Sequence, residues 1–81
     1  MGYFVYFLRC RDDSLYCGYT HDLVERVKLH RVGRASKYTR SRLPIVLVYS
    51  EPFSTQSLAM KREAEIKSFT RKKKLDLINK R

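Results

Sequence analysis

The chain has 81 residues, 43% of them hydrophobic, which predicts one small domain (residues 1–81) with a thin core. Eighteen lysines and arginines face eight acids, and the resulting net charge of +10 predicts a polyanionic partner. A Lys-rich surface that serves solubility alone is the alternative. An anionic membrane is disfavoured, because no stretch sets its bases opposite large apolar groups. With no secretory leader or spanning segment, we expect a cytoplasmic protein with reduced thiols at Cys10 and Cys17.

Two apolar runs, residues 3 to about 10 and 15–19, flank a polar break and predict an antiparallel β-hairpin. The first run is apolar on both faces, so we expect helices on both sides of the sheet. Tyr6 and Tyr16 share a face only if the loop between the strands has an odd number of residues or a bulge intervenes. An odd loop such as Asp12-Asp13-Ser14, with Asp13 in the left-handed region, meets this condition.

The next segment predicts a helix, because Asp22 and Glu25 form a capping pattern before an apolar stripe of Leu23, Val27 and His30. Gly33 is expected to end this helix. Residues 34–42 carry four bases and predict a surface loop or a single helical turn.

Residues 43–50 predict a third strand that starts at Pro44 and is buried on both faces. A long helix is then expected from a cap at Ser54 to about residue 69, with Glu63 at the edge of an inner stripe of Leu58, Ala59, Arg62, Ile66 and Phe69. Thr70 is expected to begin a last helix, packed by Leu75 and Ile78. The predicted fold is α+β, a small antiparallel three-stranded sheet flanked by helices in the order ββαβαα.

Two common catalytic devices are missing from the sequence. No serine lies on a Gly-flanked elbow, and three glycines are too few for a phosphate-binding loop. The remaining candidates are Tyr6, Tyr16, Arg26, His30 and Glu63. Taken singly, each has a structural explanation: packing tyrosines, a solvated arginine, a core histidine, and a helix-surface ion pair of Glu63 with Lys67.

Taken together, these residues resemble the GIY-YIG nuclease superfamily. Its first signature corresponds to Phe4-Val5-Tyr6 and its second to Tyr16-Cys17-Gly18, followed by Arg26, His30 and Glu63. The resemblance covers residues 3 to about 79, and in length the chain is similar to the small single-domain UPF0213 group. Phe4 replaces the usual Gly and Cys17 the usual Ile, and we expect Cys17 to be a small buried substitute rather than a nucleophile.

The resemblance implies hydrolysis of a DNA phosphodiester with one divalent metal, Mg²⁺, which Glu63 would hold. Arg26 would contact the scissile phosphate. One tyrosine, with Tyr6 preferred, would take a proton from the attacking water, and the other would orient that water. His30 could hydrogen-bond a tyrosine or the phosphate, Gly18 would allow a close approach, and Asn79 could reach the site.

Basic residues outside this set predict contacts to DNA phosphates without sequence readout; they are Arg34, Lys37, Arg40, Arg42, Lys72, Lys73 and Lys74. The expected partner is branched, flapped, nicked or single-stranded DNA in repair or recombination, with or without a protein partner. The alternatives are a non-catalytic nucleic-acid-binding module on the same scaffold and a small RNA-associated protein.

Overall fold

A computed structural model describes residues 2–80 of the chain. Its centre is an antiparallel sheet in the order β2-β1-β3, formed by β1 (Tyr3–Arg9), β2 (Leu15–Thr20) and β3 (Val46–Phe53). This arrangement confirms the predicted α+β class and the three-stranded antiparallel sheet.

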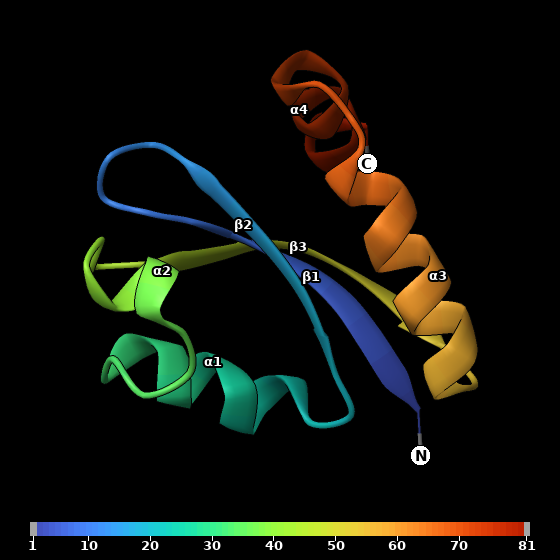
Figure 1. The fold of residues 1–81 in the computed structure, drawn as a ribbon, viewed down its shortest axis with the longest axis horizontal. Helices are drawn as coiled ribbons and strands as arrows, with labels where there is room; N and C mark the ends of the chain where they lie inside the picture. Colours follow the sequence, from blue (N-terminus) through green and yellow to red (C-terminus); the bar gives the residue numbers. More distant parts are fainter. Residues whose placement is uncertain (1, 81) are drawn as a thin grey trace.

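Four helices surround the sheet (Figure 1). On one side lie α1 (Leu23–Arg31) and the short α2 (Lys37–Arg40), and on the other α3 (Gln56–Lys67) and α4 (Arg71–Asn79). The single turn α2 falls within the segment expected to be a loop or one helical turn.

The central strand β1 supplies the core on both faces of the sheet. Val5 and Phe7 pack with Ala59 and Ile66 of α3, whereas Tyr6 and Leu8 pack with Val27 of α1. Because alternate residues of a strand point to opposite faces, one apolar run fills both clusters. The expectation of helices on both sides is therefore confirmed.

The hairpin turn has the odd length that the two tyrosines require. The Cys10 amide donates to the Ser14 carbonyl at 2.9 Å, so the loop is residues 11–13, one residue earlier than the suggested 12–14, and Asp13 has a φ of 70° as expected. Strand pairing places Leu8 opposite Tyr16. Tyr6 and Tyr16 therefore point to the same face, the one covered by α1.

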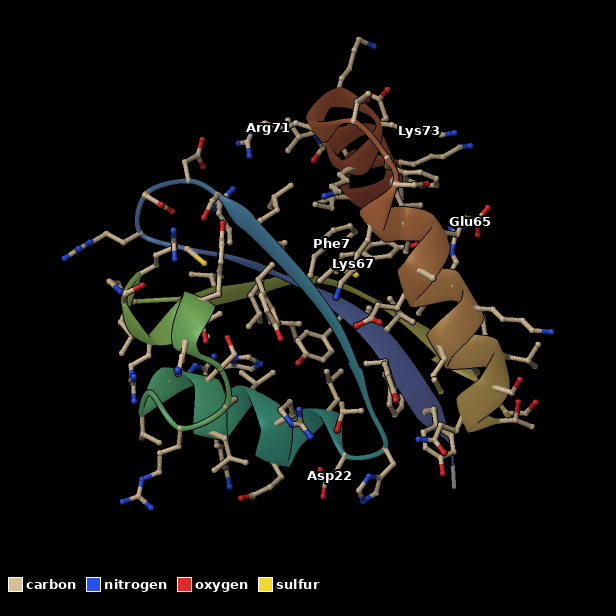
Figure 2. All side chains as sticks on the ribbon, viewed as in Figure 1. Phe7, Asp22, Glu65, Lys67, Arg71 and Lys73 are labelled. Atoms are coloured by element: carbon tan, nitrogen blue, oxygen red, sulfur yellow. The ribbon has the colours of Figure 1, made fainter. Side chains whose placement is uncertain are left out.

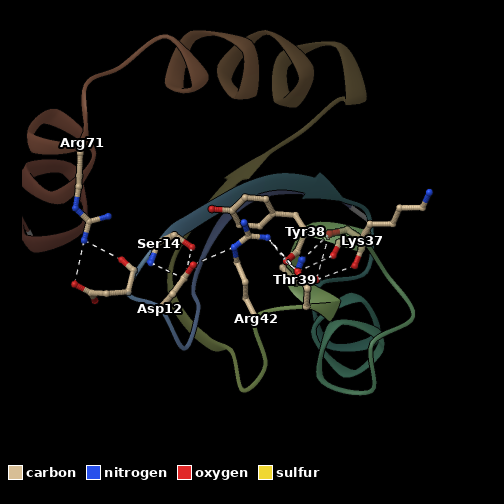
Figure 3. A network of polar contacts seen from close by, with 10 residues as sticks. Asp12, Ser14, Lys37, Tyr38, Thr39, Arg42 and Arg71 are labelled. Atoms are coloured by element: carbon tan, nitrogen blue, oxygen red, sulfur yellow. Dashed lines mark hydrogen bonds and ion pairs between the residues drawn. The ribbon is translucent and has the colours of Figure 1, made fainter.

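Arginines from two distant segments hold this turn (Figure 3). Arg42, which follows α2, donates from Nε to Asp12 at 3.1 Å, and Arg71 of α4 donates to the Asp13 carbonyl at 2.9 Å. The tip of the hairpin thus connects the segment after α2 to α4.

The helix caps follow the sequence with one correction. Asp22 accepts from the Glu25 amide at 3.0 Å, Thr70 caps α4, and Gly33 has a φ of +77° just beyond α1. The cap of α3 is Thr55 rather than Ser54, and its side chain accepts from the amide of Leu58 at 3.2 Å.

The limits and burial of the third strand were predicted wrongly. It runs over Val46–Phe53 and forms an edge of the sheet, so it is only half-buried, and Val46 is 50% exposed. Pro52 is tolerated there because an edge strand does not need every amide as a donor. Leu58, expected on the inner face of α3, is 46% exposed.

No helix in residues 2–80 combines the length and the apolar character needed to span a bilayer.

Candidate active site

A cleft of about 370 Å³ opens along the free edge of β2, between α1 and α3. Its lining comes from both faces of the sheet. We call Tyr6, Tyr16, Gly18, Thr20 and Arg26 the catalytic wall, and Tyr3, Tyr19, His21 and Gln56 the aromatic wall; Glu63 completes the lining. The cleft therefore brings together Tyr6, Tyr16, Arg26, Gly18 and Glu63 from the predicted set.

His30 lies behind the cleft rather than in it. It is fully buried, and its Nε2 is 2.9 Å from Tyr6 Oη while its Nδ1 is 2.8 Å from Thr39 Oγ1. A neutral imidazole has one donor and one acceptor nitrogen, so it donates to one of these hydroxyls and accepts from the other. His30 thus fixes Tyr6, which is one of its two expected roles.

Burial determines the charge state of this buried pair. It lowers the pKa of His30 to about 4, with help from the positive charge of Arg26, so the imidazole is neutral at pH 7. Burial also raises the pKa of Tyr6 well above its ordinary value, an effect that Tyr16 reinforces and Arg26 opposes. Tyr6 is therefore a neutral phenol whose hydroxyl is engaged inside the protein.

Tyr16 differs from Tyr6 in its surroundings. It is half-buried and lies between three rings, with centroid distances of 5.2 Å to His30, 6.4 Å to Tyr6 and 5.8 Å to Tyr38. Its hydroxyl has no hydrogen-bond partner among the described residues. The ring is thus held by packing, while the hydroxyl stays available in the cleft.

Glu63 reaches the cleft from α3, and its side chain is 19% exposed. Lys67 Nζ lies 3.5 Å from Glu63 Oε2, one helical turn away, and Figure 2 shows Lys67 extending from α3 towards β2. The ion pair suggested by the sequence is therefore present, and Glu63 also faces the candidate site.

The donor set of the cleft fits a divalent cation of the magnesium type. Glu63 is the one carboxylate in the lining, and residues 2–80 contain no group of three or more His, Cys, Asp or Glu side chains able to hold a metal. Mg²⁺ commonly takes one or two carboxylates and completes its octahedron with waters and substrate phosphate oxygens. Glu63 is the residue that would hold such an ion.

Cys17 is part of the core. It is buried against Val5, Phe7 and Ala59, and desolvation together with the nearby charge of Glu63 raises the pKa of its thiol to about 12. A thiol of this kind is a poor nucleophile.

Three of the basic residues predicted to contact DNA surround a second hollow of about 480 Å³. Arg34, Lys37 and Arg40 line it, and no acid is among its lining residues. We call these three residues the basic hollow.

Three of the four other predicted DNA contacts have partners within the protein. Arg42 pairs with Asp12 and stacks on the ring of Tyr38, with 3.8 Å between Cζ and the ring centroid. Lys72 pairs with Asp76, and Lys73 lies over the ring of Phe69. Lys74 is half-buried on α4, and Asn79, the last residue of that helix, is exposed and not among the lining of the cleft.

The aromatic wall did not emerge from the sequence. Tyr3, Tyr19, His21 and Gln56 belong to no signature, and they meet only because Tyr3 and Tyr19 face α3 across the same pair of strands. The sequence did contain one indication: alternate residues of a strand point to opposite faces of the sheet, which places Tyr3, Tyr19 and His21 on one face.

Comparisons with known proteins show the family of the chain. The model of the GIY-YIG catalytic domain matches residues 2–76. A UPF0213 protein of Staphylococcus haemolyticus is 49% identical over 98% of this chain and 96% of its own, and one from Staphylococcus aureus is 52% identical over 99% and 98%.

Two solution NMR structures are also similar. The UPF0213 protein BH0048 from Bacillus halodurans has a TM-score of 0.63 at 44% identity, covering 96% of this chain and 83% of its own. The protein EF2693 from E. faecalis has a TM-score of 0.67 at 36% identity, covering 99% and 85%. The signature tyrosines, the arginine and the helix-borne glutamate thus occur in a chain that belongs to the GIY-YIG family, within the nuclease superfamily of that name.

Proposed function

We propose that the protein is a Mg²⁺-dependent endonuclease that hydrolyses a DNA phosphodiester and selects DNA by its structure rather than its sequence, in repair or recombination. The observation that carries the proposal is the convergence of Tyr16, Arg26 and Glu63 on one cleft, although they come from β2, α1 and α3. A phosphodiester needs a cation beside its oxygens and an acceptor for the proton of the attacking water.

Arg26 is the residue suited to the scissile phosphate. No carboxylate lies within ion-pair distance of its guanidinium among residues 2–80, and its polar neighbour is the neutral Tyr6, so its positive charge is left for an anion in the cleft. A guanidinium binds phosphate oxygens in a forked geometry and keeps its charge at any relevant pH. A divalent cation at Glu63 would supply a second positive charge beside the same phosphate.

Tyr16, rather than the expected Tyr6, is our choice for the group that accepts the proton. Tyr6 is fully buried with its hydroxyl engaged by His30, whereas the hydroxyl of Tyr16 has no partner in the described chain and lines the cleft. Arg26 and Glu63 line the same cleft as this hydroxyl. Tyr6 would position Tyr16 by packing against its ring.

The test is a cleavage panel of single-stranded, flapped, forked, nicked and blunt duplex DNA, with and without Mg²⁺. We expect Mg²⁺-dependent nicking of at least one substrate and a loss of roughly 100-fold or more in rate for Glu63→Gln and Arg26→Met. Glu65→Gln is the matched control, because Glu65 is on the same helix but pairs with Arg62 on its exposed side. Equal activity of the wild-type and Glu63→Gln proteins on every substrate would contradict the proposal.

A non-catalytic nucleic-acid-binding module is the second candidate, and the ion pair of Glu63 with Lys67 is the observation in its favour. This function predicts salt-sensitive DNA binding that neither Mg²⁺ nor Glu63→Gln alters. If no substrate in the panel is cleaved and DNA binding behaves in this way, the protein is a binding module rather than a nuclease.

A further inference from the structure

The aromatic wall has no part in the chemistry described above, although it forms about half of the cleft. Tyr3 and Tyr19 are half-buried, His21 is exposed, and the rings of Tyr3 and His21 lie with centroids 6.3 Å apart. Gln56, the first residue of α3, faces the same space. The wall thus offers flat rings and one amide beside the catalytic wall.

The polar ends of these side chains lack hydrogen-bond partners in the described part of the chain. In residues 2–80, no hydrogen bond is made by the hydroxyls of Tyr3 and Tyr19, the imidazole of His21 or the amide of Gln56. Tyr3 and Tyr19 each place one part of the ring against the core cluster of Val5 and Phe7. Core packing accounts for the buried parts of these two rings, but it does not explain the polar groups that face the cleft.

A nucleobase is the ligand that matches this surface. Bases stack on aromatic side chains whatever their sequence, and amides pair with their edges. The cleft volume of about 370 Å³ lies within the range of small-molecule sites, so it exceeds what a phosphate group alone requires. A phosphate held by Arg26 carries a nucleoside on each side, and one of these would meet the aromatic wall.

We propose that the aromatic wall is a subsite for an unpaired nucleobase of DNA next to the scissile phosphate. A base within a duplex has both faces covered by its neighbours, so only a single-stranded, flapped or looped nucleotide can enter. This inference rests on the proposed function for the position of the phosphate. It goes beyond that function because it makes the cleft distinguish unpaired nucleotides from base-paired ones.

Binding measured by fluorescence anisotropy in EDTA tests the subsite without turnover. We expect the wild-type protein to bind a 12-nucleotide single strand at least about tenfold more tightly than the same sequence as a blunt duplex. A scan with one abasic residue should find a position that weakens binding by about tenfold, the order expected for one stacked base.

Variants assign that effect to the wall. His21→Ala and Gln56→Ala alter exposed side chains, so folding is preserved, and Tyr3→Leu keeps an apolar group against the core. Each should weaken single-strand binding severalfold and leave duplex binding unchanged, and the abasic substitution should then add little. Val46→Ala is the control, because Val46 is 50% exposed on β3, the edge of the sheet opposite β2, and is not among the cleft lining.

The outcomes separate the subsite from the proposed function. Equal binding of single strand and duplex, or an abasic effect that persists in His21→Ala and Tyr3→Leu, would overturn the subsite even if Mg²⁺-dependent cleavage is found. A base-dependent affinity that these variants remove, without cleavage of any substrate, would support the subsite and contradict the nuclease.

Discussion

The Tyr6 ring lies so close to the backbone of Gly18 that a β-carbon there would be 2.7 Å from Oη and 2.9 Å from Cζ. The same β-carbon would be 3.3 Å from Cε2 of Tyr16. Tyr6 has little freedom to move, because its hydroxyl is bonded to the buried His30. The glycine of the second signature therefore makes room for a side chain of this protein, where the sequence had suggested a close approach of the backbone.

Gly18→Ala should destabilise the protein by roughly 1–3 kcal/mol, the usual range for overpacking a core. Urea denaturation at pH 7 measures the change in the free energy of unfolding. In a Tyr6→Leu background the ring is absent, so the same substitution should have an effect below about 0.5 kcal/mol. Equal losses in the two backgrounds would show that the strain does not come from Tyr6.

The residues that the sequence revealed are those with a family signature or an unusual chemical type. Tyr16, Arg26 and Glu63 belong to this group, and the structure brings them to one cleft. Tyr3 and Gln56 could not be found in the same way, because a tyrosine in a strand and a glutamine at a helix start are ordinary. Their importance arises from the contact between distant elements.

At the scale of elements, His30 connects three pieces of the fold. It projects from α1, bonds Tyr6 of β1 through Nε2 and bonds Thr39 of α2 through Nδ1. All three side chains are fully buried, so protonation of the ring would place an added charge in the interior and require one of these bonds to change. The assembly of α1, α2 and the sheet therefore depends on a neutral histidine.

Acidification should destabilise the protein through this residue. Its folded pKa of about 4 lies below the ordinary 6.5, so the unfolded chain binds a proton first as the pH falls between these values. Integrating this difference in proton binding over pH gives a decrease of roughly 2 kcal/mol in the free energy of unfolding from pH 7.5 to pH 5. Urea denaturation at both values should show this loss in the wild type and a much smaller one in His30→Gln, and a similar loss in both would contradict the assignment.

Elements with strong local signals were predictable, and those set by tertiary position were not. The hairpin was correct because Asp13 tolerates the left-handed conformation that an odd loop needs. The prediction for the third strand was wrong because an apolar run in residues 43–48 suggested a strand buried on both faces. The actual strand β3 instead continues through Ser50, Glu51 and Pro52, which suit an edge position.

Across the whole molecule, the excess of bases is divided between those that hold the fold and those left for a partner. Arg42 and Arg71 bind the hairpin turn, and Arg62 donates from two nitrogens to Glu51, which joins α3 to β3. The basic hollow, in contrast, has no acid in its lining. Net charge alone could not make this distinction, since it requires the positions of the acids.

The affinity for single-stranded DNA should depend steeply on salt. If about five phosphates are neutralised, the slope of log K against log[NaCl] is about −3.5, from roughly −0.7 per phosphate on a single strand. Replacing Arg34, Lys37 and Arg40 by Gln should reduce the magnitude of this slope by about 2. Anisotropy titrations over a range of NaCl concentrations measure it.

Lys72→Gln is the control for this measurement, because Lys72 already pairs with Asp76. It should change the slope by less than 1. An unaltered slope in the triple variant would mean that the basic hollow lies off the path of the DNA.

If Glu63 holds a divalent ion as proposed, that ion would compete with the ammonium group of Lys67 for the carboxylate. That ammonium group lies 3.5 Å from Oε2 and stays on α3, one turn further along, whether or not it keeps this contact. The local charge would change from zero to +2, the sum of the carboxylate, the metal and the lysine. Metal and DNA phosphate would therefore bind cooperatively here, because the charge of the bound metal would add to that of Lys67 and attract the phosphate.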